Sequence, residues 1–181
     1  MVQIDLAIFT FISLIIFQLT SANDLARGWG DGIAWMSFKD GLEASKESGK
    51  PLMLIIHKTW CGACKSLKPK FGAHKGIEEL SENFIMVNTE DDEEPEGETY
   101  KPDGGYIPRI LFLNSAGEVQ TDIINEGGNP SYKYYYPDPA NIHKTMSKAK
   151  DSIKAVAADS ETVKEEEPIA SDGGRDPEGE L

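Results

Sequence analysis

The stretch Leu52-Met-Leu-Ile-Ile-His-Lys-Thr-Trp-Cys-Gly-Ala-Cys64 decides the fold. Residues 52–56 are apolar with no polar alternation, which is typical of a short strand buried on both faces. The two cysteines of the chain follow this strand directly, and beyond them Leu67 and Phe71 recur at a helical spacing. We therefore expect Cys61 to stand where a buried strand gives way to a helix.

A cysteine at the start of a helix is chemically activated. It faces unpaired backbone N–H groups and the positive end of the helix dipole, which favour the thiolate and lower the pKa of the thiol. The thiolate is the attacking species, and Cys64 lies one turn further on, where it can resolve a mixed disulfide formed at Cys61. The pattern predicts a redox-active Cys61-Cys64 dithiol, with Trp60 shielding the site and offering a face to a bound peptide.

Two other uses of such a cysteine pair stay open at this point. Tetrahedral zinc needs about two further ligands, and the three histidines of the chain, His57, His74 and His143, form no spaced pair. An inert local disulfide is the second alternative, although so short a loop would stabilise the fold very little. The strand-to-helix setting favours redox chemistry, so we expect no metal.

The rest of the chain predicts further helices and strands around this core. Ser37 is placed to cap a helix that ends before Gly49. Pro69 is expected to bend the helix that follows the cysteines. Other expected elements are strands at 84–88, 109–113 and 118–124, the last two forming a hairpin through a turn at 114–117, and a closing helix over 139–157. This order predicts an α/β protein in which a mixed central sheet is flanked by helices, a three-layer sandwich.

The two ends differ in composition from the middle of the chain. An apolar run over residues 6–19, followed by small residues, predicts a signal peptide over residues 1–22. As a helix this run would span roughly 21 Å against a hydrocarbon core of ~30 Å, so an uncleaved anchor is the weaker alternative. Residues 158–181 hold nine acidic and two basic residues, a balance of seven negative charges within the net −13, and predict a disordered acidic tail.

Net charge limits the partners that the chain can bind. A formal charge of −13 and a pI near 4.6 argue against nucleic acid, because the field of the protein would repel polyphosphate. The acidic run at 90–98 lacks the ligand spacing and the glycine of a calcium-binding loop, so it is interpreted as a solvated loop rather than a calcium site. Lys58 and Arg109 are interpreted as surface charges, with stabilisation of a thiolate at Cys61 as the alternative, and His57 as a packed neutral histidine rather than a catalytic one.

Together these residues resemble the thioredoxin superfamily. The run Lys58-Thr-Trp-Cys-Gly-Ala-Cys-Lys65 looks like its active site, Pro69 like its helix-kinking proline, and Ile107-Pro108 like its cis-proline segment. The resemblance implies a thioredoxin fold over residues 23–157. It also implies a cis peptide bond before Pro108, and a substrate groove in which Gly62, Ala63, Ile107 and Pro108 support the dithiol.

More narrowly, residues 60–71, 102–113 and 129–134 resemble the small endoplasmic-reticulum thioredoxins, which are related to the anterior-gradient proteins. That family implies a glutathione-linked protein-disulfide reductase with oxidase and isomerase ability. Its partners would be client proteins with thiols or disulfides and glutathione, with no bound cofactor. The final residues Glu180 and Leu181 match a retention signal that a receptor of the reticulum reads, but Gly179 replaces the usual acid. The reticulum lumen is the expected location, with secretion as the alternative.

Two departures from the superfamily pattern leave the redox direction open. Ile55 stands six residues before Cys61, where many thioredoxins carry a buried acid that assists proton transfer. The dipeptide between the cysteines is Gly62-Ala63, found neither in reducing thioredoxins nor in oxidising isomerases.

The predicted function is protein thiol-disulfide exchange in the secretory pathway. The alternative is a quality-control module with little turnover, which captures clients through a groove near Tyr106, Pro108 and residues 134–136. Cys64 favours the enzyme, because a pure capture module has no use for a resolving thiol.

Overall fold

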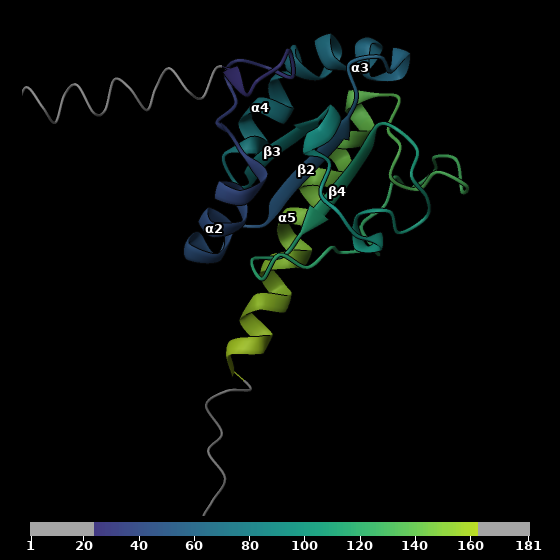
Figure 1. Cartoon of the computed structure of the whole chain (residues 1–181). Coiled ribbons are helices and arrows are strands. Elements are labelled where there is room, and N and C mark those ends of the chain that lie inside the picture. The colour runs from purple at the N-terminus through teal and green to yellow at the C-terminus, as the bar shows by residue number, and fades with distance from the viewer. Residues whose placement is uncertain (1–23, 163–181) are drawn as a thin grey trace, which may run out of the picture.

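The structure is a computed structural model that describes the backbone of residues 24–162 and the side chains of residues 24–153 (Figure 1). The predicted signal peptide and the part of the predicted tail beyond residue 162 lie outside the described residues. The strands are β1 (Trp35–Met36), β2 (Leu52–His57), β3 (Ile85–Glu90) and β4 (Arg109–Leu113). The helices are α2 (Phe38–Ser48), α3 (Gly62–Gly72), α4 (Lys75–Ser81) and α5 (Pro139–Thr162), with short 3₁₀ turns η1 (Asp91–Glu93) and η2 (Glu98–Tyr100).

The four strands form one mixed sheet in the order β1-β3-β2-β4. Strand β3 runs parallel to both β1 and β2, whereas β4 pairs antiparallel with β2. All six residues of β2 are buried, as expected for a central strand without polar alternation. The predicted α/β class with a mixed sheet flanked by helices is therefore confirmed, and the sheet carries β2 to the cysteines.

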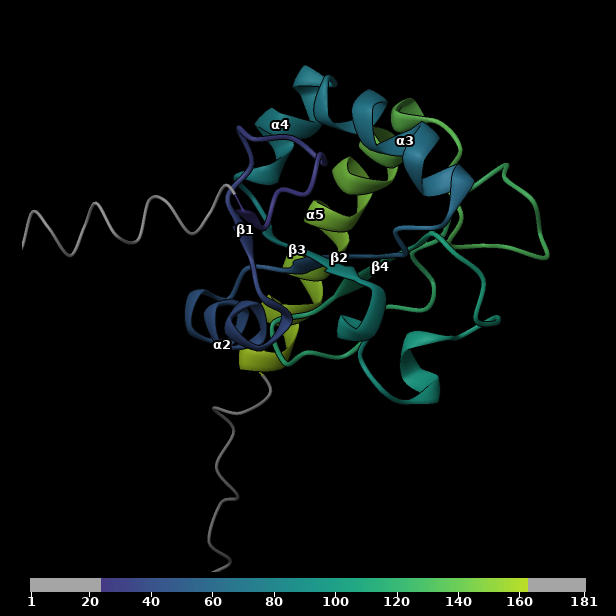
Figure 2. The ribbon, with the colours of Figure 1, turned by 45° about the horizontal axis from the view of Figure 1, so that its top comes forward.

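Alternate residues of β2 enter two separate cores, because successive side chains of a strand point to opposite faces. Met53 and Ile55 lie in the core that α3, α4 and α5 cover. Leu52, Leu54 and Ile56 lie in the core on the other face, which α2 and the segment around Tyr100 cover. Figure 2 shows α3 and α4 on one side of the sheet and α2 on the other, which completes the three layers.

Helix α2 has the ends that the sequence predicts. The side chain of Ser37 accepts a hydrogen bond from the backbone N–H of Asp40 at 3.2 Å, which satisfies one of the free donors of the first turn. Gly49 ends the helix with a φ of 70°, a left-handed conformation that glycine adopts without a steric penalty.

The segment from Leu67 to Leu80, whose apolar residues recur at helical spacings, forms two helices rather than one. Pro69 lies inside α3, which ends three residues later at Gly72. Helix α4 starts anew with His74 as its cap, whose Nδ1 accepts the backbone N–H of Ile77 at 3.2 Å. The stripe survives the break, because Leu67, Phe71 and Ile77 are all buried in the same core.

The segment before α2 forms an ordered arm across α3. Trp29 and Trp35 are both buried, and the two rings pack on Phe71. Backbone meets backbone at this crossing, since a Cβ added to Gly72 would lie 2.9 Å from the nitrogen of Gly30. The arm thereby closes the α3 face of the sheet and adds the short strand β1.

The predicted hairpin is present, but its second strand is much shorter than 118–124. The turn at 114–117 is closed by the Gly117 N–H on the Asn114 carbonyl at 2.9 Å, and the returning chain pairs antiparallel with β4 through one bridge between Leu113 and Val119, beside which the Gln120 N–H donates to the Phe112 carbonyl at 2.8 Å. A turn closed by the Ile123 N–H on the Gln120 carbonyl, at 3.2 Å, then bends the chain away from the sheet edge. Burial of Ile123 in the α5 core takes the place of a longer ladder.

Helix α5 forms where a closing helix was predicted, and it buries one stripe of residues, Ile142, Met146, Ala149 and Ile153. It runs to Thr162, past the predicted end near residue 157. Among the described residues, no helix is long and apolar enough to cross a membrane.

Candidate active site

The two cysteines lie where β2 hands over to α3, and they are joined as a disulfide. Their Cα atoms are 5.3 Å apart, within the usual range for such a bridge. Cys61 keeps 5% of its surface exposed and Cys64 keeps none. A sulfur atom from solvent therefore reaches Cys61 first, which fits the predicted order of attack and resolution.

Cys61 is the N-cap residue of α3. Its backbone is extended, and its Sγ accepts the N–H of Cys64 at 3.1 Å. After reduction, the same N–H group and the positive helix end face the Cys61 sulfur, so they stabilise its thiolate over its thiol.

The cis-proline segment lies against the dithiol, as the resemblance implied. The Ile107-Pro108 peptide bond is cis. The carbonyl oxygen of Ile107 is 3.8 Å from the Sγ of Cys61. Because Ile107 lies two residues before β4, the antiparallel pairing of β4 with β2 brings the segment to the site.

The other predicted support residues are the sequence neighbours of Cys61. Trp60 is 72% exposed, so its ring is available to a bound peptide, as predicted. Gly62 begins α3, and a Cβ added there would meet nothing within 4 Å. Ala63 is half-buried. Trp60 and Gly62, on either side of Cys61 in the sequence, are thus both exposed.

No buried acid stands behind the dithiol at the usual superfamily position. Ile55 is fully buried there and pairs with Asn88 and Ile110 in the sheet. The nearest buried titratable group along β2 is His57, whose Nε2 lies 3.2 Å from the Oδ1 of Asn88.

His57 is a packed neutral histidine, as predicted. Its side chain is fully buried beside the ring of Trp29. Burial is the main cause that lowers the pKa of His57 to about 4, with Lys68 adding a smaller repulsion. The hydrogen bond with Asn88 and the charge of Glu90 oppose the shift without overcoming it.

Arg109 is not the surface charge that its sequence position suggested. Its side chain is fully buried, and Nε donates to the carbonyl of Tyr100 at 3.0 Å. Its guanidinium also pairs with Glu94, which in turn holds Lys58 at 2.8 Å. Two cations, one three residues before Cys61 and one directly after Pro108, therefore share one carboxylate.

The acidic run at 90–98 is correspondingly more structured than a solvated loop. Glu90 pairs with Lys68 at 3.0 Å, and Glu93 pairs with Arg27. The carboxylate of Asp91 accepts the N–H and the hydroxyl of Thr59 at 2.9 and 2.8 Å. Sequence reasoning missed these partners because they lie far apart along the chain, and the only available signal was the density of acids after a buried strand.

The aromatic groove that the capture alternative requires is mostly closed. Tyr134 and Tyr136 are buried in the two cores and offer no surface to a client. Tyr106 contacts Tyr132 edge-to-face, with ring centroids 4.9 Å apart, and Tyr132 is exposed. The exposed aromatic surface near the cis-proline segment therefore centres on this pair.

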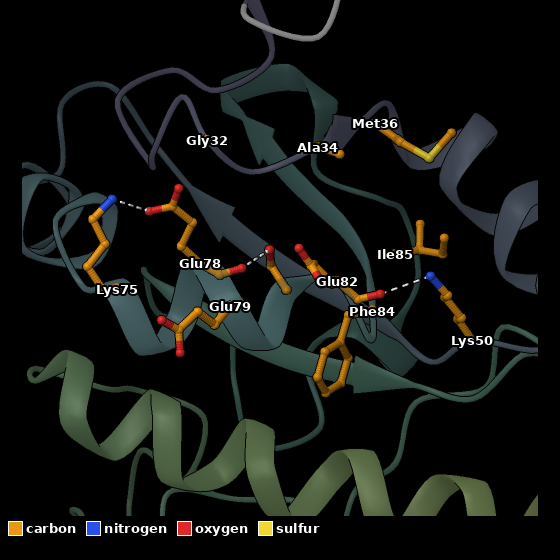
Figure 3. Close-up of a pocket in the computed structure, with 11 residues that line it drawn as sticks. Gly32, Ala34, Met36, Lys50, Lys75, Glu78, Glu79, Glu82, Phe84 and Ile85 are labelled. Atoms are coloured by element: carbon orange, nitrogen blue, oxygen red, sulfur yellow. Dashed lines mark hydrogen bonds and ion pairs between the residues drawn. The ribbon is translucent and has the colours of Figure 1, made fainter.

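A hollow of the described surface lies away from the dithiol. It lies between α4 and β1, as Figure 3 shows, and its rim carries Lys75, Glu78 and Glu82. Both of its lysines are engaged, Lys75 with the Glu78 carboxylate and Lys50 with the Glu82 carbonyl. A smaller hollow beside the active site is lined by Lys58, Thr59, Trp60, Asp91 and Asp92. Within residues 24–153, no three His, Cys, Asp or Glu side chains gather to hold a metal ion.

Comparison with known proteins matches this geometry to one family. The family profile described as "Thioredoxin-like" matches residues 34–115. Anterior gradient protein 2-B of Xenopus laevis is 34% identical over 142 residues, which cover 78% of this chain and 85% of that protein. The human anterior gradient protein 2 homolog is 37% identical over 131 residues, 72% of this chain and 74% of its own length.

A solved structure supports the fold. The thioredoxin from Thermus thermophilus aligns with a TM-score of 0.50 at 17% identity, covering 70% of this chain and 93% of its own. The mixed sheet and its helices are thus those of the thioredoxin fold.

Proposed function

Because this chain belongs to the anterior gradient family of thioredoxin-like proteins, we propose that it is a thiol-disulfide oxidoreductase acting on other proteins. The observation that carries the proposal is the pair of cysteines at the start of α3, with only Cys61 reachable and the Ile107 carbonyl beside its sulfur. That arrangement supports exchange with an extended client segment.

The proposed reaction proceeds through one mixed disulfide. The Cys61 thiolate attacks a client disulfide, forms a bond to one client sulfur and displaces the other as a thiolate. Cys64 then attacks the Cys61 sulfur, which releases the reduced client and closes the Cys61-Cys64 disulfide. Two glutathione thiols return the dithiol by forming glutathione disulfide. Run in reverse, the same steps oxidise a client, so the direction depends on the reduction potential.

We place this chemistry in the secretory pathway, in the reticulum lumen. The apolar run over residues 6–19 supports entry into that pathway. The final residues Glu180 and Leu181 support recognition by a retention receptor. A dithiol of this kind finds both thiols and disulfides among the proteins that fold there.

Trapping of clients tests the proposed function. Cys64→Ala removes the resolving thiol, so mixed disulfides between Cys61 and client proteins should accumulate in cells and disappear on reduction. Cys61→Ala is the matched control, because the remaining cysteine is fully buried and should trap nothing. Capture of the same clients by both variants, or by neither, would contradict disulfide exchange and favour a module that binds clients without turnover.

A further inference from the structure

Two basic residues in the segments that flank the dithiol pair with the same acidic residue. Glu94 accepts from Lys58 at 2.8 Å through Oε2 and from Arg109 through Oε1. Lys58 lies three residues before Cys61, and Arg109 directly follows Pro108. One carboxylate in the loop after β3 therefore connects the two segments that flank the reactive sulfur.

The Arg109 charge has no access to water. Its side chain is fully buried, and its donors not directed at Glu94 meet the backbone carbonyls of Tyr100 and Tyr106. A buried cation is tolerated only with a charged partner and satisfied donors. Glu94 is the carboxylate that pairs with Arg109.

Both the backbone and the side chain of Lys58 form hydrogen bonds around the active-site loop. Its backbone carbonyl accepts the N–H of Cys61 at 3.2 Å. Its ammonium group donates to the Asp91 carbonyl as well as to Glu94. Its positive charge is therefore held next to the reactive loop.

Glu94 stays ionised in this setting. Burial alone would raise its pKa, but the hydrogen bonds from Lys58 and Arg109 outweigh burial and lower the pKa below its usual value. The carboxylate thus cancels part of the positive potential that the two cations would otherwise exert on the Cys61 sulfur.

We propose that Glu94 sets the redox poise of the dithiol by neutralising Lys58 and Arg109, and so keeps it less oxidising than the two cations alone would make it. This inference rests on the proposed exchange chemistry. In the reaction with glutathione, the Cys61-Cys64 bond breaks and the bond of glutathione disulfide forms. Two electrons and two protons pass from two glutathione thiols to the two cysteine sulfurs, and the Cys61 proton leaves to solvent where the thiolate is stable. Any charge that stabilises this thiolate stabilises the reduced form and makes the disulfide a stronger oxidant.

Glu94→Gln tests the proposal, because it keeps the shape of the side chain and removes its charge. The equilibrium constant with reduced and oxidised glutathione should move about tenfold toward the dithiol, a potential less negative by about 30 mV. Lys58→Met removes one cation and should move the constant in the opposite direction, and the double variant should return toward the wild type. Glu96→Gln, an exposed acid of the same loop, is the matched control and should leave the constant unchanged.

The outcomes separate this proposal from the proposed function. A wild-type dithiol that fails to equilibrate with glutathione would overturn both. A wild type that equilibrates while Glu94→Gln and Glu96→Gln share its constant would overturn only the role of Glu94. If circular dichroism shows that Glu94→Gln does not fold, Lys58→Met alone decides, and a constant unchanged or shifted toward the dithiol would refute the proposal.

Discussion

Cys61 and Cys64 have identical side chains but different surroundings. Cys61 caps α3 and keeps 5% of its surface exposed, with the Ile107 carbonyl 3.8 Å from its sulfur, whereas Cys64 is fully buried one turn further on. In the proposed exchange reaction, this difference in exposure gives Cys61 the attacking role and Cys64 the resolving role. The difference arises from their places on one helix.

His57 gives a prediction about pH at the residue scale. Burial lowers its pKa to about 4, whereas the pKa of an unfolded histidine is about 6.5. Between these two pH values, His57 is protonated in the unfolded state but not in the folded state. The free energy of unfolding therefore decreases as the pH falls from about 6.5 toward 4. Between about pH 7.5 and about pH 5 the loss from this one group is about 2 kcal/mol.

Denaturant unfolding of His57→Gln checks this effect. Glutamine does not titrate, so the variant should lose about 2 kcal/mol less stability than the wild type over that interval. His143→Gln, on the half-buried side of α5, serves as the control for removing a histidine. An unchanged pH dependence in His57→Gln would show that His57 is not the group responsible.

At the scale of elements, the crossing of the arm and α3 holds the site in place. Gly72 lets the backbone of the arm approach the helix that presents Cys61, while Trp29 packs edge-to-face on Phe71 below it. A methyl group at position 72 has no free space, because its nearest neighbours are backbone atoms of Gly30. The arm is thus part of the active-site scaffold.

Gly72→Ala should destabilise the protein by about 1–3 kcal/mol, because the new methyl group forces the two backbones apart. Chemical denaturation of the oxidised protein measures the change. Gly62→Ala is the matched control for stability, since its methyl group would point into open space at the start of the same helix. A loss for Gly72→Ala no larger than that for Gly62→Ala would mean that the close crossing does not constrain the fold.

Elements with a local signal were predictable from the sequence. A few neighbouring residues suffice to predict each of these features. They are the apolar run of β2, the Ser37 cap of α2 and the end of α2 at Gly49. The dithiol was predictable for the same reason, because strand, cysteines and helix are contiguous.

Features that depend on distant partners were not predictable. The alternating polar and apolar residues at 118–124 are compatible with a long strand and with a bend. The chain bends after Val119, and Ile123 is buried in the core that α5 covers. Arg109 and Glu94 are fifteen residues apart, with no periodicity to link them. Tyr134 and Tyr136 lie in a loop sequence, and only the packed cores show that they are buried.

At the scale of the whole molecule, the sheet organises every part of the site. The cysteines follow strand β2, the cis-proline segment precedes β4, and Glu94 lies in the loop after β3. Segments next to three neighbouring strands, distant in sequence, are thus joined by the ion pairs of Glu94 with Lys58 and Arg109 and by the contact of the Ile107 carbonyl with the Cys61 sulfur. The site therefore requires the complete thioredoxin-like domain.

Processing of the chain gives a prediction for the whole protein. If residues 1–22 direct entry into the secretory pathway, the protein isolated from that pathway should begin at Asn23. N-terminal sequencing or intact mass measures this directly. An intact Met1 on the protein in the reticulum would contradict cleavage and favour an uncleaved anchor.

The reduction potential of Cys61-Cys64 tests the central claim most directly. Protein beginning at Asn23 would be equilibrated with glutathione buffers and the free thiols counted by alkylation and mass. Reversible exchange of both cysteines is predicted, with a value near the reticulum poise of about −180 to −210 mV for an oxidase or isomerase and near about −270 mV for a reductase. A pair that never equilibrates with glutathione would contradict the enzymatic account.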